Sequence, residues 1–448
     1  MKRLATLRLL LLAILTAALL PRSAAARWSI TPRLYAEGQY DDNLFLSDDD
    51  MTDDFITTVS PGIDLAHQSP TDEVVLDYQY TRSFFQDSPE LDYSGHLGHL
   101  EARKDFGRLR LALSEAFVRS ENPVELTGLV TFERPSIRRG ERFRYTRNIV
   151  RPELRFRFGE GRSITLRYRN NLLRNDAEDV ADQDGNAYGA ALSFQINAPN
   201  QVEVVYDRFD RNYGGTTPPI ASRSHDEDVA LFRYTHSLNP RTALLAEYRY
   251  DRVAFDRESE GFPDYTVHDP RLGFSHRFTE TTFLIVTAGY ALRNETRNEG
   301  ESPSGRADLS GSYKRLEVEA YGEGGFDADF VGAELLGFYE FWRAGLHPAL
   351  QVLEKLWAEG YFYIERDDFE DIDRRDTILS GRASLTCQVL PWLFVSLDYQ
   401  RIERSSNIDT QEFEDNRYLA RITAQKDLFE NVPEPGWRPG RPPWKTRL

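Results

Sequence analysis

Hydrophobic and polar residues alternate along most of the chain between Trp28 and Phe429, with the two-residue period of a β-strand. Within 242–251, Leu244 and Tyr248 share one face, whereas Glu247 and Arg249 share the other. The same alternation occurs in 154–158, 164–169, 316–320 and 393–400. The exception is 349–357, where the pattern predicts a short helical turn between strands. The chain is therefore predicted to be all-β.

The connections between the predicted strands fall into two alternating classes. Tight turns are expected around Pro70, Gly107, Gly159–Gly161, Pro199, Pro240, Thr279–Thr281, Lys314–Arg315 and Pro391. Longer, polar and often acidic loops are expected at 41–54, 86–92, 121–141, 175–185, 212–226, 256–264, 295–304, 367–376 and 405–415. Short periplasmic turns and longer outer loops alternate in this way in bacterial outer-membrane barrels. Segment 326–330 is short for an outer loop, and 344–356 is long for a periplasmic turn.

This layout predicts a single closed antiparallel transmembrane β-barrel of about 16–20 strands, occupying residues 27–429. The strand at Trp28–Tyr40 should pair with the strand at Asn416–Phe429, because an open sheet edge cannot lie in hydrocarbon. The rival fold is a soluble exported β-sandwich or propeller, whose apolar faces would meet in a dry core. The many aromatic residues at predicted strand ends favour the membrane, where such residues form interfacial girdles.

The two ends of the chain differ from the barrel in composition. Residues 1–26 resemble a signal peptide, with basic residues, then the apolar run Leu9–Leu20, then a small-residue cleavage site at Ala24–Ala26. Residues 430–448 are rich in proline and are expected to form a disordered periplasmic tail. Phe429, at the end of the last predicted strand, would then serve as an internal signal for the barrel assembly machinery. The expected location is the outer membrane of a Gram-negative bacterium.

The composition of the chain argues against several classes of protein. The formal net charge of −17 argues against binding to nucleic acid. Cys387 is the single cysteine, so no disulfide can form within the chain. The mean hydropathy is −0.55. Outside the N-terminus, no segment approaches the roughly 20 consecutive apolar residues of a spanning helix.

The segment from Tyr40 to Gly62 resembles a known family. Tyr40-Asp41-Asp42-Asn43-Leu44-Phe45, followed by Asp53 and Val59-Ser60-Pro61-Gly62, is similar to the start of the β-barrel porin 2 family. It is also similar to outer-membrane barrels that are encoded with exopolysaccharide systems. The resemblance implies a conduit for polysaccharide export, with a polysaccharide and a periplasmic export partner as its contacts besides outer-membrane lipid. It carries over no catalytic residues.

No residue pattern predicts catalysis, a cofactor or a metal site. His96 and His99 would point to opposite faces of a strand, which makes them a poor pair of metal ligands. The acidic run 48–54 lacks the spacing of a calcium-binding loop, so a solvated loop is expected. The protein is therefore predicted not to be an enzyme. An outer-membrane enzyme or a purely structural barrel ranks third, behind polysaccharide export and general or solute-selective diffusion.

Charged residues opposite the apolar faces are the candidate pore lining. If apolar residues meet lipid, a group of arginines faces the lumen from two adjacent strands, and a group of glutamates faces it from later strands: Arg155, Arg157, Arg167 and Arg169; Glu317, Glu319, Glu323, Glu359 and Glu365. Separate basic and acidic walls would create a transverse field that orients charged or hydroxyl-rich solutes. The equally weighted alternative is that these charges pair with one another and keep the interior solvated.

Overall fold

A computed structural model describes residues 27–122, 124–125, 136–137, 142–177, 180, 182–214, 224–256, 264–295, 299–329, 337–369 and 373–429. Among these residues, strands dominate, and the helical parts are single turns at Pro89–Leu91 and Asp409–Gln411. In the same ranges, no helix is long and apolar enough to cross a membrane. The predicted signal peptide at 1–26 and the predicted tail at 430–448 lie outside the described residues.

The strands follow one another along the chain with little else between them. The first ten of the barrel are β1 (Arg27–Asp41), β2 (Asp54–Gln68), β3 (Asp72–Phe85), β4 (Tyr93–Asp105), β5 (Leu109–Ser120), β8 (Tyr145–Gly159), β9 (Arg162–Asn175), β10 (Asp182–Asn197), β11 (Asn200–Gly214) and β12 (His225–Asn239). The other ten are β13 (Thr242–Phe255), β14 (Tyr265–Arg277), β15 (Phe283–Glu295), β16 (Glu299–Tyr313), β17 (Leu316–Asp329), β18 (Gly337–Leu353), β19 (Leu356–Phe369), β20 (Arg374–Leu390), β21 (Leu393–Ser406) and β22 (Phe413–Gln425). A small hairpin, β6 (Val124–Glu125) and β7 (Ser136–Ile137), belongs to the connection between β5 and β8.

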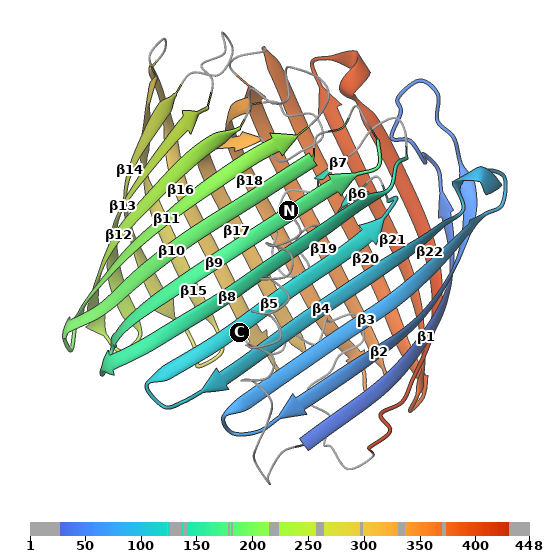
Figure 1. The fold of residues 1–448 in the computed structure, drawn as a ribbon, viewed down its shortest axis with the longest axis horizontal. Coiled ribbons are helices and arrows are strands. Elements are labelled where there is room, and N and C mark those ends of the chain that lie inside the picture. The colour runs from blue at the N-terminus through green and yellow to red at the C-terminus, as the bar shows by residue number, and fades with distance from the viewer. Residues whose placement is uncertain are drawn as a thin grey trace, which may run out of the picture.

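Twenty strands form one antiparallel sheet that closes on itself (Figure 1). Each strand pairs with its neighbours along the chain, and β22 returns to pair with β1. The closing register runs from Arg33 opposite Gln425 to Asp41 opposite Arg417. Closure leaves no unpaired sheet edge, as hydrocarbon requires. The predicted fold is therefore confirmed, including the closing pair of strands, with the strand number at the top of the expected range.

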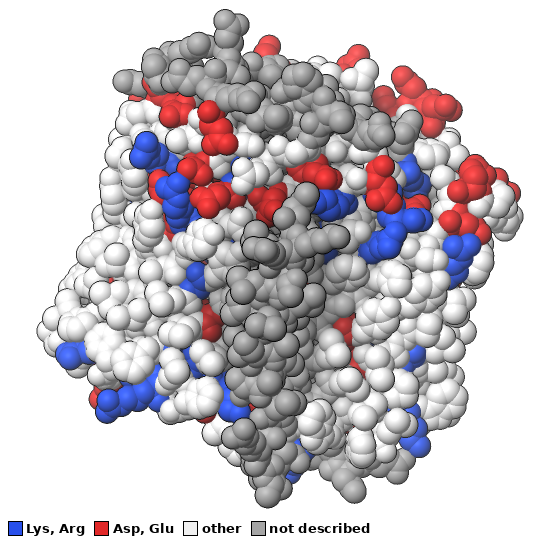
Figure 2. Space-filling view, in the orientation of Figure 1, with Lys and Arg blue, Asp and Glu red and all other residues white. Residues whose placement is uncertain are grey.

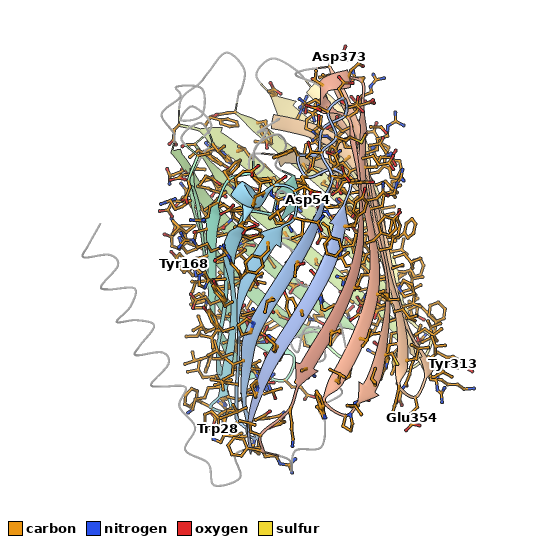
Figure 3. The ribbon with its side chains drawn as sticks, turned by 90° about the vertical axis from the view of Figure 1, so that its right-hand side faces the viewer. Trp28, Asp54, Tyr168, Tyr313, Glu354 and Asp373 are labelled. Atoms are coloured by element: carbon orange, nitrogen blue, oxygen red, sulfur yellow. The ribbon has the colours of Figure 1, made fainter. Side chains whose placement is uncertain are left out.

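Short turns gather at one end of the barrel and longer connections at the other. Trp28, Tyr313 and Glu354 lie near the short-turn end, whereas Asp373 lies at the opposite end (Figure 3). Gly107 and Gly161 lie in two of the tight turns with φ of 84° and 60°, the left-handed region that glycine enters without a Cβ clash. We take the short-turn end as periplasmic, as in other bacterial barrels.

Four local predictions were wrong. The short loop predicted at 326–330 is strand as far as Asp329, where β17 ends. Residues 349–357 form no helical turn: β18 continues to Leu353, a turn follows at Glu354–Lys355, and β19 begins at Leu356. The supposedly long turn at 344–356 is therefore mostly strand. The loop predicted at 295–304 is also mostly strand, since β16 begins at Glu299. Polar residues can occupy strands there because strand ends that project beyond the lipid are polar on both faces.

Candidate functional site in the barrel lumen

The two faces of the barrel wall differ in chemistry. Large apolar side chains are exposed on the outer face, among them Leu192, Val204, Phe232, Leu272 and Phe362. In the space-filling view, Lys, Arg, Asp and Glu gather in a band towards the upper end and at the lower edge, and the described surface between them carries few charged residues (Figure 2). An apolar belt between two polar rims is the surface that a bilayer covers. The inner face carries the candidate pore lining.

The predicted arginines share the inner face of β8 and β9, but acidic residues lie among them. Arg157 is 3.7 Å from Asp105 of β4, measured from Nη2 to Oδ2. Arg155 donates a hydrogen bond of 3.3 Å to the Ser163 hydroxyl. Arg169 lies further along the inner face, opposite Ala187. The structure thus places the four guanidinium groups on one stretch of wall whose charge is partly compensated.

Arg167 forms a bridge across a whole strand. Its Nε and Nη2 atoms donate hydrogen bonds of 3.0 and 2.8 Å to the two carboxylate oxygens of Asp207. Arg167 is on β9 and Asp207 is on β11, and Gly189 of β10 is the register partner of both. A Cβ atom at Gly189 would lie 2.6 Å from Cγ of Arg167. The glycine therefore leaves the space in which this bidentate pair forms.

The predicted glutamates come from β17 and β19 and flank two basic residues of β18. His347 lies 3.7 Å from Glu319 and 2.6 Å from Glu359, between ring nitrogen and carboxylate oxygen. Arg343 is 3.0 Å from Glu323 and is also the register partner of Glu365. Glu317 and Glu359 both lie opposite Ala349. The acidic wall is thus a three-strand charge network rather than an uninterrupted row of carboxylates.

The sequence pattern did not identify His347 because 344–356 was predicted to be a turn, and a turn residue has no fixed inward direction. Arg343 lies just before that segment, where the alternation was not followed. The alternation itself was present: Leu346 and Leu350 are exposed on the outer face, and His347 lies between them on the inner face. Continuing the two-residue period through 337–353 would have found both basic residues.

We expect Arg343→Leu to destabilise the barrel. The substitution leaves Glu323 and the fully buried Glu365 facing each other without the guanidinium between them. Breaking a fully buried ion pair from one side costs about 3–5 kcal/mol, because the remaining charge stays buried. Since the side chains of Arg343 and Glu323 are 17% and 22% exposed, we expect a loss below that range. Urea unfolding in lipid vesicles would measure the loss. As a control, Arg375→Leu removes the exposed pair with Asp368; it should cost below ~1 kcal/mol. Equal losses in both variants would contradict the network.

The connection between β1 and β2 folds into the outer mouth of the lumen. Asn43 is fully buried, and its amide donates hydrogen bonds of 2.6 Å to the Ser47 carbonyl and 2.7 Å to the Glu414 carbonyl of β22. Asp42 accepts 2.6 and 3.0 Å hydrogen bonds from the backbone and side chain of Asn416. These contacts hold the start of the connection against the strand that closes the barrel.

Two leucines of this connection bury their side chains against neighbouring parts of the inner wall, on either side of β1. Leu44 packs with Ile56 and Phe85 on the inner faces of β2 and β3. Leu46 packs in a cluster on the inner faces of β19 to β22, formed by Tyr363, Ile378, Ile402 and Phe413. Both leucines are fully buried. We call residues 42–53 the mouth loop, because it spans the inner wall between these two groups of strands.

Charged side chains change from buried to exposed down the lumen. At the mouth, the side chains of Arg374 and Asp376, and of Arg417 and Asp415, are paired and at most 8% exposed. Towards the periplasmic end, the side chains of Arg157 and Glu319 are 43% and 40% exposed. Water therefore reaches the inner wall of the periplasmic half, whereas the outer half is narrowed by inward-folded chain.

No group of three or more histidine, cysteine, aspartate or glutamate side chains in the described ranges could hold a metal ion. Asp54, at the end of the acidic run, instead accepts hydrogen bonds of 3.0 Å from the backbone nitrogens of Gln86, Asp87 and Ser88. The carboxylate thus fixes the neighbouring outer connection. His96 contacts Tyr78 through a 2.8 Å hydrogen bond on the exposed outer surface.

No protein-family model matches the chain, and no curated protein matches it in sequence. Solved structures do resemble it. The FrpB iron transporter from Neisseria meningitidis (F5-1 variant) aligns with a TM-score of 0.52 at 8% identity, over 89% of this chain and 82% of that one. The siderophore receptor PirA from Pseudomonas aeruginosa aligns with a TM-score of 0.50 at 9% identity, over 89% and 80%. OccAB4 from Acinetobacter baumannii covers 89% and 98%, with a TM-score of 0.40 at 11% identity.

The closed fold, the apolar belt and its polar rims define the class of this protein. It is a transmembrane β-barrel of the Gram-negative outer membrane. The similarity to solved barrels concerns the fold. Within that class, the solute that passes through a barrel depends on the side chains of its own lumen.

Proposed function

We propose that the protein is an outer-membrane channel through which small hydrophilic solutes diffuse. The observation that carries this proposal is the exposure of charged side chains on the inner wall of the periplasmic half. Arg167, for example, is 40% exposed although it points into the barrel. Barrels of 16–18 strands already leave an aqueous channel, and this one has twenty. A wide and wet interior with charged walls favours solute passage over a sealed structural barrel.

The distribution of charge supports a preference among solutes. The wall of β8 and β9 is rich in arginine, and β17 and β19 contribute the glutamates that lie around Arg343 and His347. Partly paired charges of both signs create a local field across the lumen while keeping it solvated. Hydroxyl-rich or zwitterionic solutes can replace their hydrogen bonds to water by hydrogen bonds to such walls at little cost in free energy. The proposed function involves no catalytic step.

Planar-bilayer recording would test the proposal with the purified protein. We expect measurable ion conductance, and we expect Arg157→Gln together with Arg167→Gln to move ion selectivity towards cations. The reason is that Asp105 and Asp207 lose their guanidinium partners, so the local wall becomes negative. Reversal potentials in a salt gradient measure the shift. A folded wild-type barrel without any conductance would contradict a channel. A conducting double variant with unchanged selectivity would place the constriction elsewhere.

Polysaccharide export is the narrower function implied by the resemblance at residues 40–62. The fold similarity adds no support to it, so small-solute diffusion is the function that we propose first. Deletion of the gene separates the two. Loss of surface polysaccharide with unchanged solute uptake would favour export, and lost uptake with unchanged polysaccharide would favour diffusion.

A further inference from the structure

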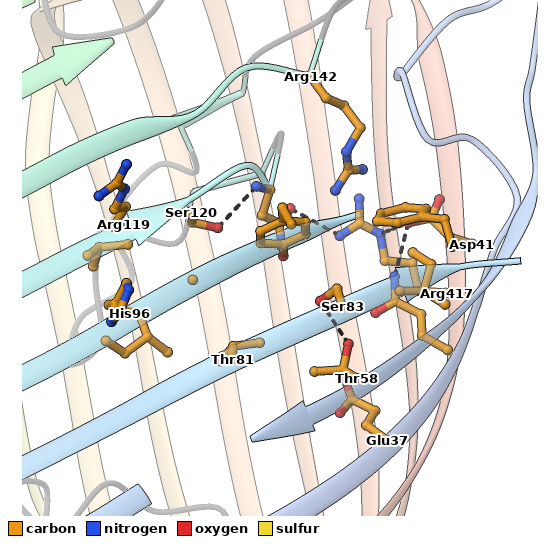
Figure 4. Close-up of a pocket in the computed structure, with 18 of the residues that line it drawn as sticks. Glu37, Asp41, Thr58, Thr81, Ser83, His96, Arg119, Ser120, Arg142 and Arg417 are labelled. Atoms are coloured by element: carbon orange, nitrogen blue, oxygen red, sulfur yellow. Dashed lines mark hydrogen bonds and ion pairs between the residues drawn. The ribbon is translucent and has the colours of Figure 1, made fainter. Parts of the chain in front are cut away.

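A cavity of about 290 Å³ opens on the lumen side of β1 to β5 near the outer mouth. Its size is just below the ~300–1,000 Å³ typical of small-ligand pockets. The inner faces of β1 to β5 form its walls, and Arg142, from the connection that leads into β8, contributes to the side nearest the mouth (Figure 4). None of the predicted pore-lining residues belongs to it. The cavity is therefore a feature of its own.

Arg142 brings a positive charge that has no carboxylate partner in the described part of the chain. Its Nη1 atom makes one long hydrogen bond, 3.4 Å to the Leu44 carbonyl, and its guanidinium carbon lies 5.1 Å from the Phe85 ring centre. Burial lowers the pKa of the Arg142 side chain. A guanidinium has five N–H donors, and a buried cation is costly without an anion. These contacts leave most of its donors for a ligand.

The acidic residues whose charge reaches Arg142 are already engaged. Asp41 lies 3.1 Å from Arg417, and Glu121 lies 2.7 Å from Arg144. Arg417 lines the same cavity and lies between the carboxylates of Asp41 and Asp415. Of these two cavity arginines, Arg142 is thus the one with no carboxylate at ion-pair distance among the described residues, which favours an anionic ligand group beside it.

The rest of the cavity wall offers hydroxyl groups and aromatic rings. Thr58 and Ser83 are hydrogen-bonded to each other at 3.0 Å on its floor, and Ser120 lines the opposite part. Each hydroxyl has one donor and two acceptor positions, so one mutual bond leaves capacity for a ligand. Tyr93 and Tyr145 add aromatic surface. Hydroxyl groups and aromatic surface together suit a molecule with many hydroxyls and an apolar C–H face.

We propose that this cavity binds a sugar acid, with the carboxylate at Arg142 and the ring hydroxyls at the Thr58–Ser83 side. A simple anion would use Arg142 alone and leave the hydroxyl floor unexplained. A neutral sugar would leave the charge of Arg142 uncompensated. That such a sugar acid is also the solute of the channel rests on the function proposed above. That the cavity binds it rests on the residues of the cavity alone.

Isothermal calorimetry on the full-length protein in detergent tests binding without requiring conduction. The probes are D-galacturonate, D-galactose and acetate. A hydrogen bond to a charged group contributes about 1.5–3 kcal/mol, so galacturonate should bind roughly ten- to a hundredfold more tightly than galactose. Acetate should bind more weakly than galacturonate, because it lacks hydroxyls. Equal affinity for galacturonate and acetate would reduce the cavity to an anion site, and equal affinity for the two sugars would remove the role of Arg142.

Two variants locate the contacts. Arg142→Gln should bring galacturonate down to the affinity of galactose, and Thr58→Val should weaken both sugars. Arg375→Gln, which removes an exposed arginine outside the cavity, should leave all three affinities unchanged. Heat-modifiable gel migration shows that each variant is folded. Unchanged binding in folded Arg142→Gln overturns the proposal. Absent binding in a conducting wild-type protein would overturn this proposal alone, and binding without conduction would overturn only the channel.

Discussion

Val204→Arg should prevent assembly of the barrel, whereas Val205→Arg should be tolerated. The two valines are neighbours on β11, so their side chains point to opposite faces. Val204 is 43% exposed on the outer face, between its register partners Leu192 and Phe232. Val205 points into the lumen between Glu203 and Asp207. The same substitution therefore places the same charge in lipid or in water.

The expected difference is large for an outer-membrane barrel. Arginine on the lipid face costs about 2–4 kcal/mol at the bilayer midplane and less near the interfaces. Val205→Arg instead places its charge in a hydrated lumen, beside Glu203 and Asp207, which are already paired with Arg233 and Arg167. Folding into lipid vesicles, followed by heat-modifiable gel migration and urea titration, would measure both variants. If Val204→Arg assembles normally and Val205→Arg fails, the inside–outside assignment of this wall is inverted.

The strand layout could be predicted because its signals are local. Alternation fixes which residues share a face, and residues such as Gly161 or Pro240 mark turns within a few positions. The same rule placed Arg155, Arg157, Arg167 and Arg169 together on one face. It failed at 295–304 and 344–356, where polar residues or an apparent helical period obscured strands that continue.

The partners of the charged residues could not be predicted, because they depend on register between strands. The register between β8 and β9 places Glu153 opposite Arg167, and it places Arg155 and Arg157 opposite Thr165 and Ser163. The bridge to Asp207 further requires a glycine on the strand between them. Neither relation is visible in one strand alone. Similarly, Leu44 and Leu46 stand in a polar, acidic segment that is typical of a solvated loop, and only the closed barrel supplies the inner wall that buries them.

Loosening the mouth loop should increase conductance, and we expect this to be the largest functional effect of any local change. Leu44→Ala together with Leu46→Ala removes the apolar contacts that hold the loop against β2–β3 and β19–β22. Truncating a buried leucine to alanine costs about 2–5 kcal/mol. Because the loop can open without unfolding the barrel, the substitutions weaken the binding of the loop to the inner wall and leave the strands intact. The outer half of the lumen should then be open for more of the time.

Single-channel recording would show this as a severalfold larger or more frequently open conductance. Asn43→Ala tests the same loop by a different contact, since it removes the hydrogen bonds to Ser47 and Glu414. Met51→Ala is the matched control, because Met51 belongs to the mouth loop but its side chain is 52% exposed. Unchanged conductance in a folded Leu44→Ala, Leu46→Ala variant would show that the mouth loop does not limit passage. A rise in that variant and in Asn43→Ala, but not in Met51→Ala, would identify the docked loop as the barrier at the outer mouth.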